Sequence, residues 1–176
     1  MSNSDTPITC ADIPVGKTVT VKVPASSANL GPGYDTLGVA LGFYDELRVE
    51  CISEGLEFEL SGEGSEAVPR DETHLVIQAM HAAFERGGLH EFPALRLTAH
   101  NRIPHSRGMG SSASAIVAGV AAASGLLPEH AQLSRDQILQ VASDLEGHPD
   151  NVAPSVYGSL SISWGELGDW RSLVVP

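Results

Sequence analysis

The sequence predicts an α+β domain with a largely antiparallel sheet. Apolar residues alternate with polar ones over much of the N-terminal third, which is the period of β-strands. Further along, apolar residues recur at the three- and four-residue spacing of helices. Strands that precede helices in this way are typical of α+β folds, whereas parallel sheets alternate strand and helix. The sequence has no internal repeat, and 176 residues are enough for one domain with a buried core.

Composition and charge restrict the possible partners. The chain has 22 acidic and 10 basic residues, a net charge of −12 and no cluster of Lys or Arg, which argues against nucleic-acid binding. The longest apolar stretch, 116–123, is too short to span a bilayer, and residues 1–12 lack a secretory signal. Cys10 and Cys51 have no metal-binding spacing. We therefore expect a cytoplasmic protein without a nucleic-acid or membrane partner.

The strands are predicted first along the chain. Residues 1–15 are expected to form a flexible leader. Alternating valines predict a strand over 19–23, which is followed by a Ser-, Gly- and Pro-rich loop over 24–35. Alternation resumes over 39–51, which predicts a long or bent strand, and over 56–60, which predicts another.

The helices come after a loop over 62–71. Thr73 is expected to cap a helix that ends at Gly87-Gly88, and a strand over 95–99 comes next. An alanine-rich stretch predicts a helix over 111–123.

A third helix is predicted after this one. Ser134 and Gln137 form a capping box for it, and Gly147 ends it. A last strand is expected over 156–164.

The glycine–serine segment, residues 104–114, follows the predicted strand at 95–99. It starts as a loop and continues into the predicted helix that begins at residue 111. A helix start offers unpaired backbone N–H groups and the positive end of a dipole, and glycine lets the backbone approach an anion closely. The segment is therefore either a phosphate cradle or an ordinary serine N-cap after a glycine loop.

A second polar segment comes after the third predicted helix. Glu146, His148 and Asp150 occupy alternate positions, so they would point to the same side if the chain is extended there. Glu146 and a serine hydroxyl of the glycine–serine segment could then bind one magnesium ion, because magnesium prefers oxygen ligands. The alternative is a polar turn in which Pro149 breaks the helix and Asp150-Asn151 caps the next stretch of chain.

A third polar segment covers residues 26–35. Asn29 and Asp35 flank a glycine–proline turn. Asp35 could orient a substrate group or act as a general base if it lies within hydrogen-bond reach of a reacting hydroxyl. The alternative is turn chemistry alone, since Asn, Gly and Pro are common in turns.

The three segments together resemble a known family. Residues 24–35 are similar to the first motif of homoserine kinases, and residues 103–114 resemble the Pro-x-x-x-Gly-Leu-Gly-Ser-Ser-Ala motif of the GHMP kinase superfamily. Residues 146–154 are similar to the homoserine kinase form of the segment after the third helix. The order and separation of the segments also fit, and the resemblance runs from about Val19 to the last residue.

The resemblance implies a fold. Residues 16–164 would form the GHMP kinase N-terminal, ATP-binding domain, which is α+β and similar to domain 2 of ribosomal protein S5. Residues 165–176 would begin a C-terminal region whose ferredoxin-like domain, with the family's later glycine-rich motif and substrate-clamping arginines, is largely absent from the sequence. Because a surface normally covered by that domain would be exposed, a homo-oligomer is possible.

The resemblance also implies an activity and cofactors. Homoserine kinases transfer the ATP γ-phosphate to the hydroxyl of L-homoserine, giving O-phospho-L-homoserine in threonine biosynthesis, so ATP and Mg²⁺ are expected. Magnesium would be held by Ser112, with Ser111 possible, and by Glu146. The ATP phosphates would be wrapped by Pro104, His105, Ser106, Arg107, Gly108, Met109, Gly110, Ser111, Ser112, Ala113 and Ser114.

The substrate residues implied by the resemblance come from the other two segments. Asn29 would contact the hydroxyl end of homoserine, and His148 and Asp150 would contact its amino group. Asp35 matches the family's aspartate near the reacting centre, where it is the candidate catalytic residue and a substrate contact. Phosphoryl transfer leaves the protein little covalent chemistry, so the use of a carboxylate base stays open.

Two alternatives to a homoserine kinase remain. The chain could be a catalytically silent nucleotide-binding fragment, or a GHMP kinase for another small alcohol such as mevalonate.

Three residues depart from the family motifs. They are Tyr34 in place of phenylalanine, Met109 in place of leucine and Ser114 in place of alanine.

Overall fold

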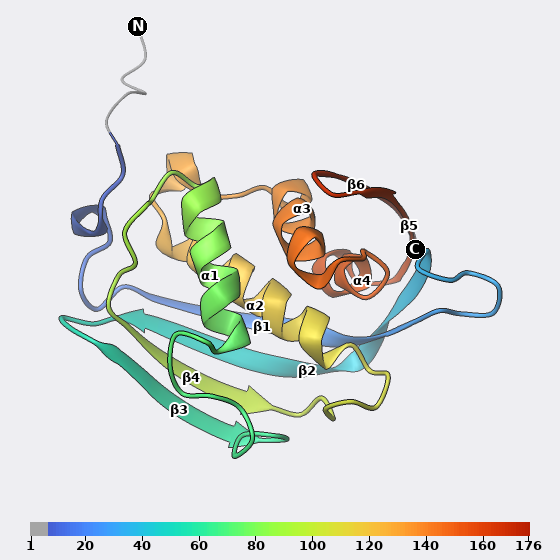
Figure 1. Cartoon of the computed structure of the whole chain (residues 1–176), viewed down its shortest axis with the longest axis horizontal. Helices are drawn as coiled ribbons and strands as arrows, with labels where there is room; N and C mark the ends of the chain where they lie inside the picture. The colour runs from blue at the N-terminus through green and yellow to red at the C-terminus, as the bar shows by residue number, and fades with distance from the viewer. Residues whose placement is uncertain (1–6) are drawn as a thin grey trace, which may run out of the picture.

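The sheet and the helices form two layers in the computed structural model, which describes residues 7–176. The helices lie on one face of a six-stranded sheet (Figure 1). The strands are β1 (Thr18–Ala28), β2 (Leu37–Cys51), β3 (Leu56–Gly62), β4 (Leu95–Asn101), β5 (Leu160–Glu166) and β6 (Asp169–Val175). The helices are α1 (Leu75–Arg86), α2 (Ser111–Leu126), α3 (Arg135–Glu146) and α4 (Val152–Tyr157), with 3₁₀ turns η1 (Cys10–Asp12) and η2 (Glu129–Ala131).

The strand order is β3-β4-β2-β5-β6, with β1 paired to β2. Every pair is antiparallel except β3 with β4, so the predicted largely antiparallel α+β sheet is confirmed. The long β2 is the centre of the sheet. Its C-terminal part pairs with β4 over residues 46–51, and its start pairs with β5 over residues 37–39. A bulge in β1 between Pro24 and Ser26 accompanies the bend between these two parts.

The core lies between the sheet and the helices. Helix α2 is apolar on almost every side and has small residues, and it is covered by α1 and α3 (Figure 1). A Cβ atom on Gly119 would lie 2.6 Å from the backbone oxygen of Val76, so only glycine allows α1 to approach α2 this closely. The glycine–serine segment is thus attached to a helix fixed at the centre of the core.

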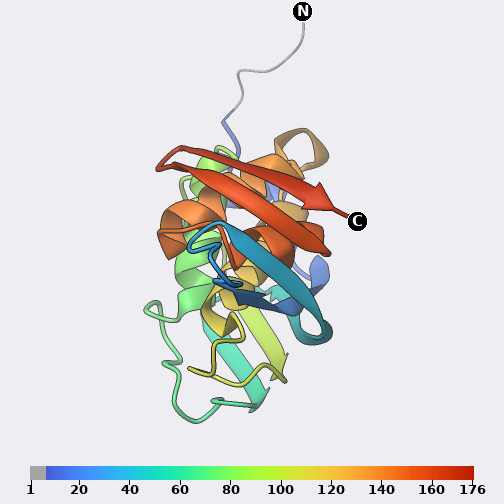
Figure 2. The ribbon, with the colours of Figure 1, turned by 90° about the vertical axis from the view of Figure 1, so that its right-hand side faces the viewer.

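The β5–β6 hairpin lies across α3 and α4 (Figures 1 and 2). The backbone N–H of Trp170 donates to Gln140 Oε1 (2.7 Å), and the Gln140 amide donates back to the Trp170 oxygen (2.5 Å). Asp144 Oδ1 accepts from the Trp170 indole N–H (2.6 Å) and from the Gly168 backbone (2.9 Å). Residues 165–175 thus form the end of β5 and the whole of β6, and they contact α3.

Several predicted elements differ from the structure. Residues 24–28 continue β1 where a loop was predicted, and Val156 lies in α4, which was not predicted, before β5 begins. Thr73 does not cap α1. His74 does, because its Nδ1 accepts the Val76 N–H at 3.2 Å.

The predicted leader lies partly outside the described residues. Within the described part, Ile8 forms a β-bridge with Leu89, and Ile13 is buried in the core. None of the helices within residues 7–176 is long and apolar enough to cross a membrane.

His74 makes the stability of the fold depend on pH. Burial lowers the pKa of this histidine below its ordinary value of 6.5, an effect only partly opposed by Asp71. The unfolded chain therefore binds the proton more readily, so the contribution of His74 is complete above pH 6.5 and is lost as pH falls through its folded pKa. Protonation also removes the acceptor for the Val76 N–H.

We expect His74→Asn, which keeps a capping acceptor but cannot titrate, to weaken the loss of unfolding free energy between about pH 7 and pH 5. Urea denaturation at a series of pH values measures this. His90→Asn, at an exposed histidine that follows α1, is the control and should behave as the wild type does. Parallel pH profiles of wild type and His74→Asn would contradict the prediction.

Candidate functional site

The three polar segments singled out in the sequence meet at one point. The Ser26 hydroxyl, fully buried on β1, donates to Asn151 Oδ1 at 2.9 Å, and the Ser26 backbone N–H donates to the Met109 oxygen at 3.1 Å. A Cβ atom on Gly110 would overlap Ser26 Oγ and lie 3.0 Å from Asn151 Oδ1. Glycine is therefore required where the glycine–serine segment passes between β1 and residue 151.

The glycine–serine segment leaves β4 and enters α2 through a loop over residues 104–110. Ser106, Gly108 and Gly110 all have left-handed backbone conformations (φ 56°, 70° and 66°). Gly110 is the N-cap of α2, and no side chain caps the helix, so the alternative of a serine N-cap is wrong. The N–H groups of the first turn are therefore not used by a capping side chain and can bind an anion at the positive end of the helix.

Ser112 and Glu146 are brought together as predicted. Ser112, in the first turn of α2, donates its hydroxyl to Glu146 Oε2 at 2.8 Å, and Glu146 is the last residue of α3. The pair places a hydroxyl and a carboxylate, both hard oxygen donors, beside the anion-binding helix start. Within residues 7–176 no three His, Cys, Asp or Glu side chains are grouped to hold a metal ion. A metal at this pair would thus need further oxygen ligands from its anion and from water.

The chain is not extended from Glu146 to Asp150, so the condition under which these three side chains would share one side is not met. The chain turns at Gly147, which has a left-handed conformation (φ 88°) and ends α3. Glu146 then faces Ser112, whereas Asp150 is completely buried. Its burial depends on Gly38 of β2, where a Cβ atom would overlap the Asp150 backbone oxygen.

Asp150, which is buried, pairs with His148, which is partly exposed. Asp150 Oδ1 accepts from the Asn151 backbone N–H (2.8 Å) and contacts His148 Nδ1 (2.5 Å). Its other oxygen, Oδ2, has no hydrogen-bond partner in the described part of the chain. A buried carboxylate oxygen without a partner is costly, which indicates that a donor belongs there. Asn151 is the N-cap residue of α4, although its side chain bonds Ser26 and does not cap that helix.

Asn29 and Asp35 lie in an exposed turn. Both have left-handed backbones (φ 56° and 52°), and the Asp35 N–H donates to Asn29 Oδ1 at 3.1 Å. Turn chemistry is therefore present at both residues. Asp35 also lines a cavity of about 350 Å³ together with His148 and with Trp164 and Trp170 of the hairpin. Asn29 does not line this cavity.

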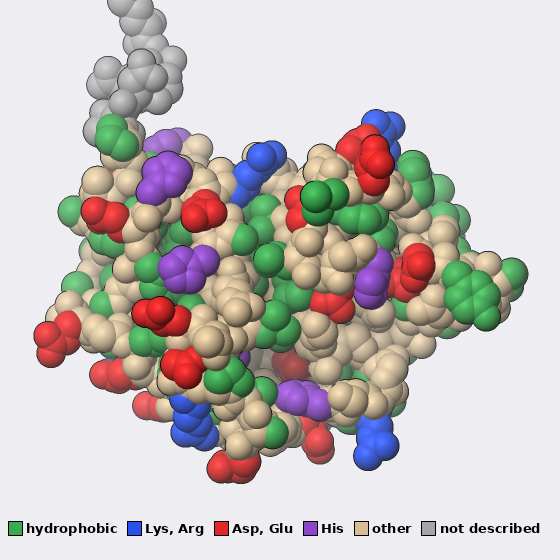
Figure 3. All heavy atoms as spheres, viewed as in Figure 1, with side chains coloured by type: hydrophobic (Ala, Val, Ile, Leu, Met, Phe, Trp, Pro, Cys, Tyr) green, Lys and Arg blue, Asp and Glu red, His purple; other side chains and the backbone are tan. Residues whose placement is uncertain are grey.

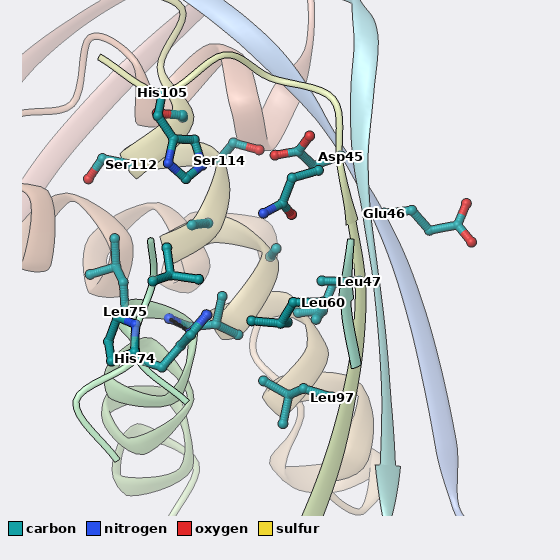
Figure 4. Close-up of a pocket in the computed structure, with 18 of the residues that line it drawn as sticks. Asp45, Glu46, Leu47, Leu60, His74, Leu75, Leu97, His105, Ser112 and Ser114 are labelled. Atoms are coloured by element: carbon teal, nitrogen blue, oxygen red, sulfur yellow. Dashed lines mark hydrogen bonds between the residues drawn. The ribbon is translucent and has the colours of Figure 1, made fainter. Parts of the chain in front are cut away.

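A second cavity, of about 310 Å³, lies beside the glycine–serine segment. Figure 4 shows it between β2–β4 and the starts of α1 and α2, with His105, Ser112 and Ser114 at one end and His74 toward the other. Most of its wall is apolar, including Leu47, Leu60 and Leu97. The hydroxyl of Ser114 is buried, lines the cavity and has no partner among residues 7–176.

The sequence did not predict the polar residues that complete this wall. Asp45, His74 and Asn101 line the cavity but belong to a strand, a helix cap and a strand end. Each looks like an ordinary structural residue in its own segment. No pattern in the sequence pointed to these residues, since the predicted cap of α1 was Thr73 and not His74.

Comparison with known proteins places this geometry in a family. Residues 74–159 match the GHMP kinases N terminal domain. The chain is 55% identical over 163 residues to the homoserine kinase of Corynebacterium aurimucosum, covering 92% of this chain and 52% of that protein. It is 54% identical over 156 residues to the homoserine kinase of Corynebacterium glutamicum, covering 89% and 50%. The chain thus spans about half the length of the curated relatives it matches.

Solved structures agree in fold. The homoserine kinase of Cytophaga hutchinsonii matches with a TM-score of 0.74 and 25% identity, covering 90% of this chain and 52% of that one. The mevalonate kinase of Methanococcus jannaschii matches with a TM-score of 0.67 at 16% identity, covering 91% and 57%, a likeness of fold alone.

We expect Gly110→Ala to destabilise the domain more than Gly108→Ala. Both glycines are left-handed, so each substitution should cost about 1–2 kcal/mol of backbone strain. A Cβ at Gly108 meets nothing within 4 Å, whereas one at Gly110 overlaps Ser26 and should cost about 1–3 kcal/mol more. Chemical denaturation measures the difference. Equal losses in the two variants would show that the contact of the three segments is not tightly packed.

Proposed function

The chain belongs to the GHMP kinases, and we propose that it forms the nucleotide-binding half of a homoserine kinase, with part of the acceptor site. The proposed reaction transfers the γ-phosphate of ATP to the side-chain hydroxyl of L-homoserine, giving O-phospho-L-homoserine, a step of threonine biosynthesis. The contact between Ser112 and Glu146 carries the proposal. Ser112 lines the cavity beside the glycine–serine segment, and Gly147, next to Glu146, lines the cavity that contains Asp35 and His148.

The cavity beside the glycine–serine segment suits the nucleoside of ATP. It is largely apolar and has a few polar groups, as expected for a nucleoside site. The polyphosphate would then lie along the glycine–serine segment, against the N–H groups of the loop and of α2. Backbone donors suit this protein, because its net charge is −12 and Figure 3 shows Lys and Arg side chains scattered singly among acidic ones.

The donor set fits a magnesium ion bound with the nucleotide. Ser112 and Glu146 offer two hard oxygen atoms, and phosphates and water supply the rest of a magnesium shell. The ion would neutralise charge that develops on the phosphates during transfer. In this arrangement Glu146 also restrains Ser112, so the hydroxyl is already oriented when the nucleotide binds.

The cavity lined by Asp35 and His148 suits an amino acid with a hydroxyl group. Asp150 does not line this cavity, but its buried carboxylate contacts His148, which does, and the ammonium group of homoserine has a charge that matches this carboxylate. His148 lies between Asp150 and the cavity, since it contacts the first and lines the second. Mevalonate and neutral sugars have no ammonium group, which favours homoserine over them. Asp35 lines the same cavity and would orient the acceptor hydroxyl or accept its proton.

A nucleotide-binding unit without turnover is the second candidate. It is favoured by the span of the chain, which is about half that of its homoserine kinase relatives. Isothermal titration with Mg-ATP, followed by an ADP-release assay with L-homoserine, mevalonate and a sugar, separates the candidates. Homoserine-dependent ADP release supports the kinase, and binding without turnover supports the second candidate. Absence of Mg-ATP binding, or preference for mevalonate, would overturn the proposal.

We expect Glu146→Gln and Ser112→Ala to weaken binding of Mg-ATP much more than binding of ATP without magnesium. Loss of one charged ligand should reduce Mg-ATP affinity by about tenfold or more, because contacts to charged groups contribute about 1.5–3 kcal/mol. Titrations with Mg²⁺ and with EDTA measure the two affinities. Glu129→Gln, at an exposed residue of η2, is the control and should change neither. Equal weakening in both buffers would argue against a magnesium site at this pair.

A further inference from the structure

The glycine–serine segment begins beside a carboxylate that belongs to none of the three polar segments. This residue, Asp45, lies on β2, one residue before Glu46, which forms the first β2–β4 pair with His100. Asp45 Oδ1 accepts hydrogen bonds from the backbone N–H groups of Arg102 (2.6 Å) and Ile103 (2.9 Å). These residues come directly after β4. The carboxylate therefore supplies the acceptor that the backbone loses where β4 leaves the sheet.

The loop after Ile103 is held at few other points. In the described structure, the backbone of residues 104–109 is bonded to the backbone of the domain body through one contact, in which the Ser26 N–H donates to the Met109 oxygen. Ile103 itself is fully buried. The loop over 104–110 is thus fixed at its end by Ser26 and Gly110, and at its start by Ile103 and Asp45. Its left-handed residues at 106 and 108 lie between these two anchors.

The charge of the Asp45 carboxylate interacts with backbone N–H groups of the chain after β4. Burial raises the pKa of the Asp45 carboxyl, and the N–H groups of Arg102 and Ile103 act against that rise, as do His105 and His100. Asp45 lines the same cavity as the serines at 112 and 114, and Figure 4 shows its side chain on the opposite wall from them. A free carboxylate in that wall would repel a nucleotide phosphate. Here two backbone N–H groups donate to Asp45, so they offset part of its charge, and the same hydrogen bonds hold the start of the loop.

We propose that Asp45 is a positioning residue that fixes the start of the glycine–serine segment and so preorganises its backbone N–H groups for the nucleotide phosphates. The binding part of this inference rests on the proposed function. The structural part does not, because the order of the loop can be measured without nucleotide. Preorganisation of this kind strengthens binding by removing the cost of ordering a loop.

The test measures loop order and nucleotide affinity in the same variants of the 176-residue chain. Amide hydrogen exchange with mass spectrometry reports on residues 102–110 in the absence of nucleotide, and isothermal titration gives the affinity for Mg-ATP. Asp45→Ala removes the acceptor. Asp45→Asn keeps an acceptor oxygen but removes the charge. Glu57→Ala is the matched control, since Glu57 of β3 is exposed, pairs with Arg96 on the surface and does not line the cavity.

In Asp45→Ala we expect faster exchange confined to residues 102–110 and a loss of about tenfold in Mg-ATP affinity, as for other lost bonds to a charged group. Asp45→Asn should restore both, and Glu57→Ala should match the wild type. If Asp45→Ala does not fold, Asp45→Ser takes its place, because serine keeps a polar group at this position but is one carbon shorter than aspartate.

Two results would overturn the inference. One is wild-type exchange of residues 102–110 in Asp45→Ala or Asp45→Ser. The other is an Asp45→Asn variant with a normally protected loop but the affinity loss of Asp45→Ala, which would make the charge and not the position of the loop decisive. If the wild-type chain does not bind Mg-ATP, the proposed function fails, and the exchange data alone decide whether Asp45 positions the loop.

Discussion

The contact of Gly110 with Ser26 and Asn151 is the constraint on which the candidate site depends. It joins β1, the glycine–serine segment and the turn after α3, which are far apart in the sequence. Ser112 lies two residues beyond Gly110, and Glu146 and His148 lie a few residues before Asn151. Fixing this one contact therefore fixes the separation of the Ser112–Glu146 pair from the cavity of Asp35 and His148. Glycine is needed because any side chain would force the three segments apart.

The long strand β2 extends this constraint to both cavities. Near its start, Gly38 leaves room for the Asp150 backbone, which positions the Asp150–His148 pair. In its second half, Asp45 binds the backbone at the end of β4 and lines the other cavity. A single bent strand therefore sets the distance between the two ends of the site. Small changes in its bend would move the proposed nucleotide and acceptor sites relative to each other.

The sequence predicted most helices and strands well, because apolar residues recur along them with a clear periodicity. It predicted the geometry of the site less well. Alternation over 39–51 located β2, and the Ser134–Gln137 capping box located α3. Alternate spacing of Glu146 and Asp150 was misleading, since the left-handed Gly147 turns the chain between them. The short α4 was not predicted, because its six residues include Pro154 and show no clear periodicity of apolar residues. The cavity beside the glycine–serine segment could not be predicted, because its wall is assembled from separate strands and helices whose residues each look like ordinary structural residues.

An acidic protein that holds a polyphosphate must concentrate positive potential locally. Here that potential comes from the loop N–H groups, the start of α2 and the proposed metal, and not from basic side chains. Such backbone donors are effective only when they all face one point, so order in the loop matters more than the number of charges. This explains why a carboxylate can lie in the wall of an anion site. Asp45 adds a negative charge, but it orients donors by binding Arg102 and Ile103, and its own potential is partly offset by the same N–H groups.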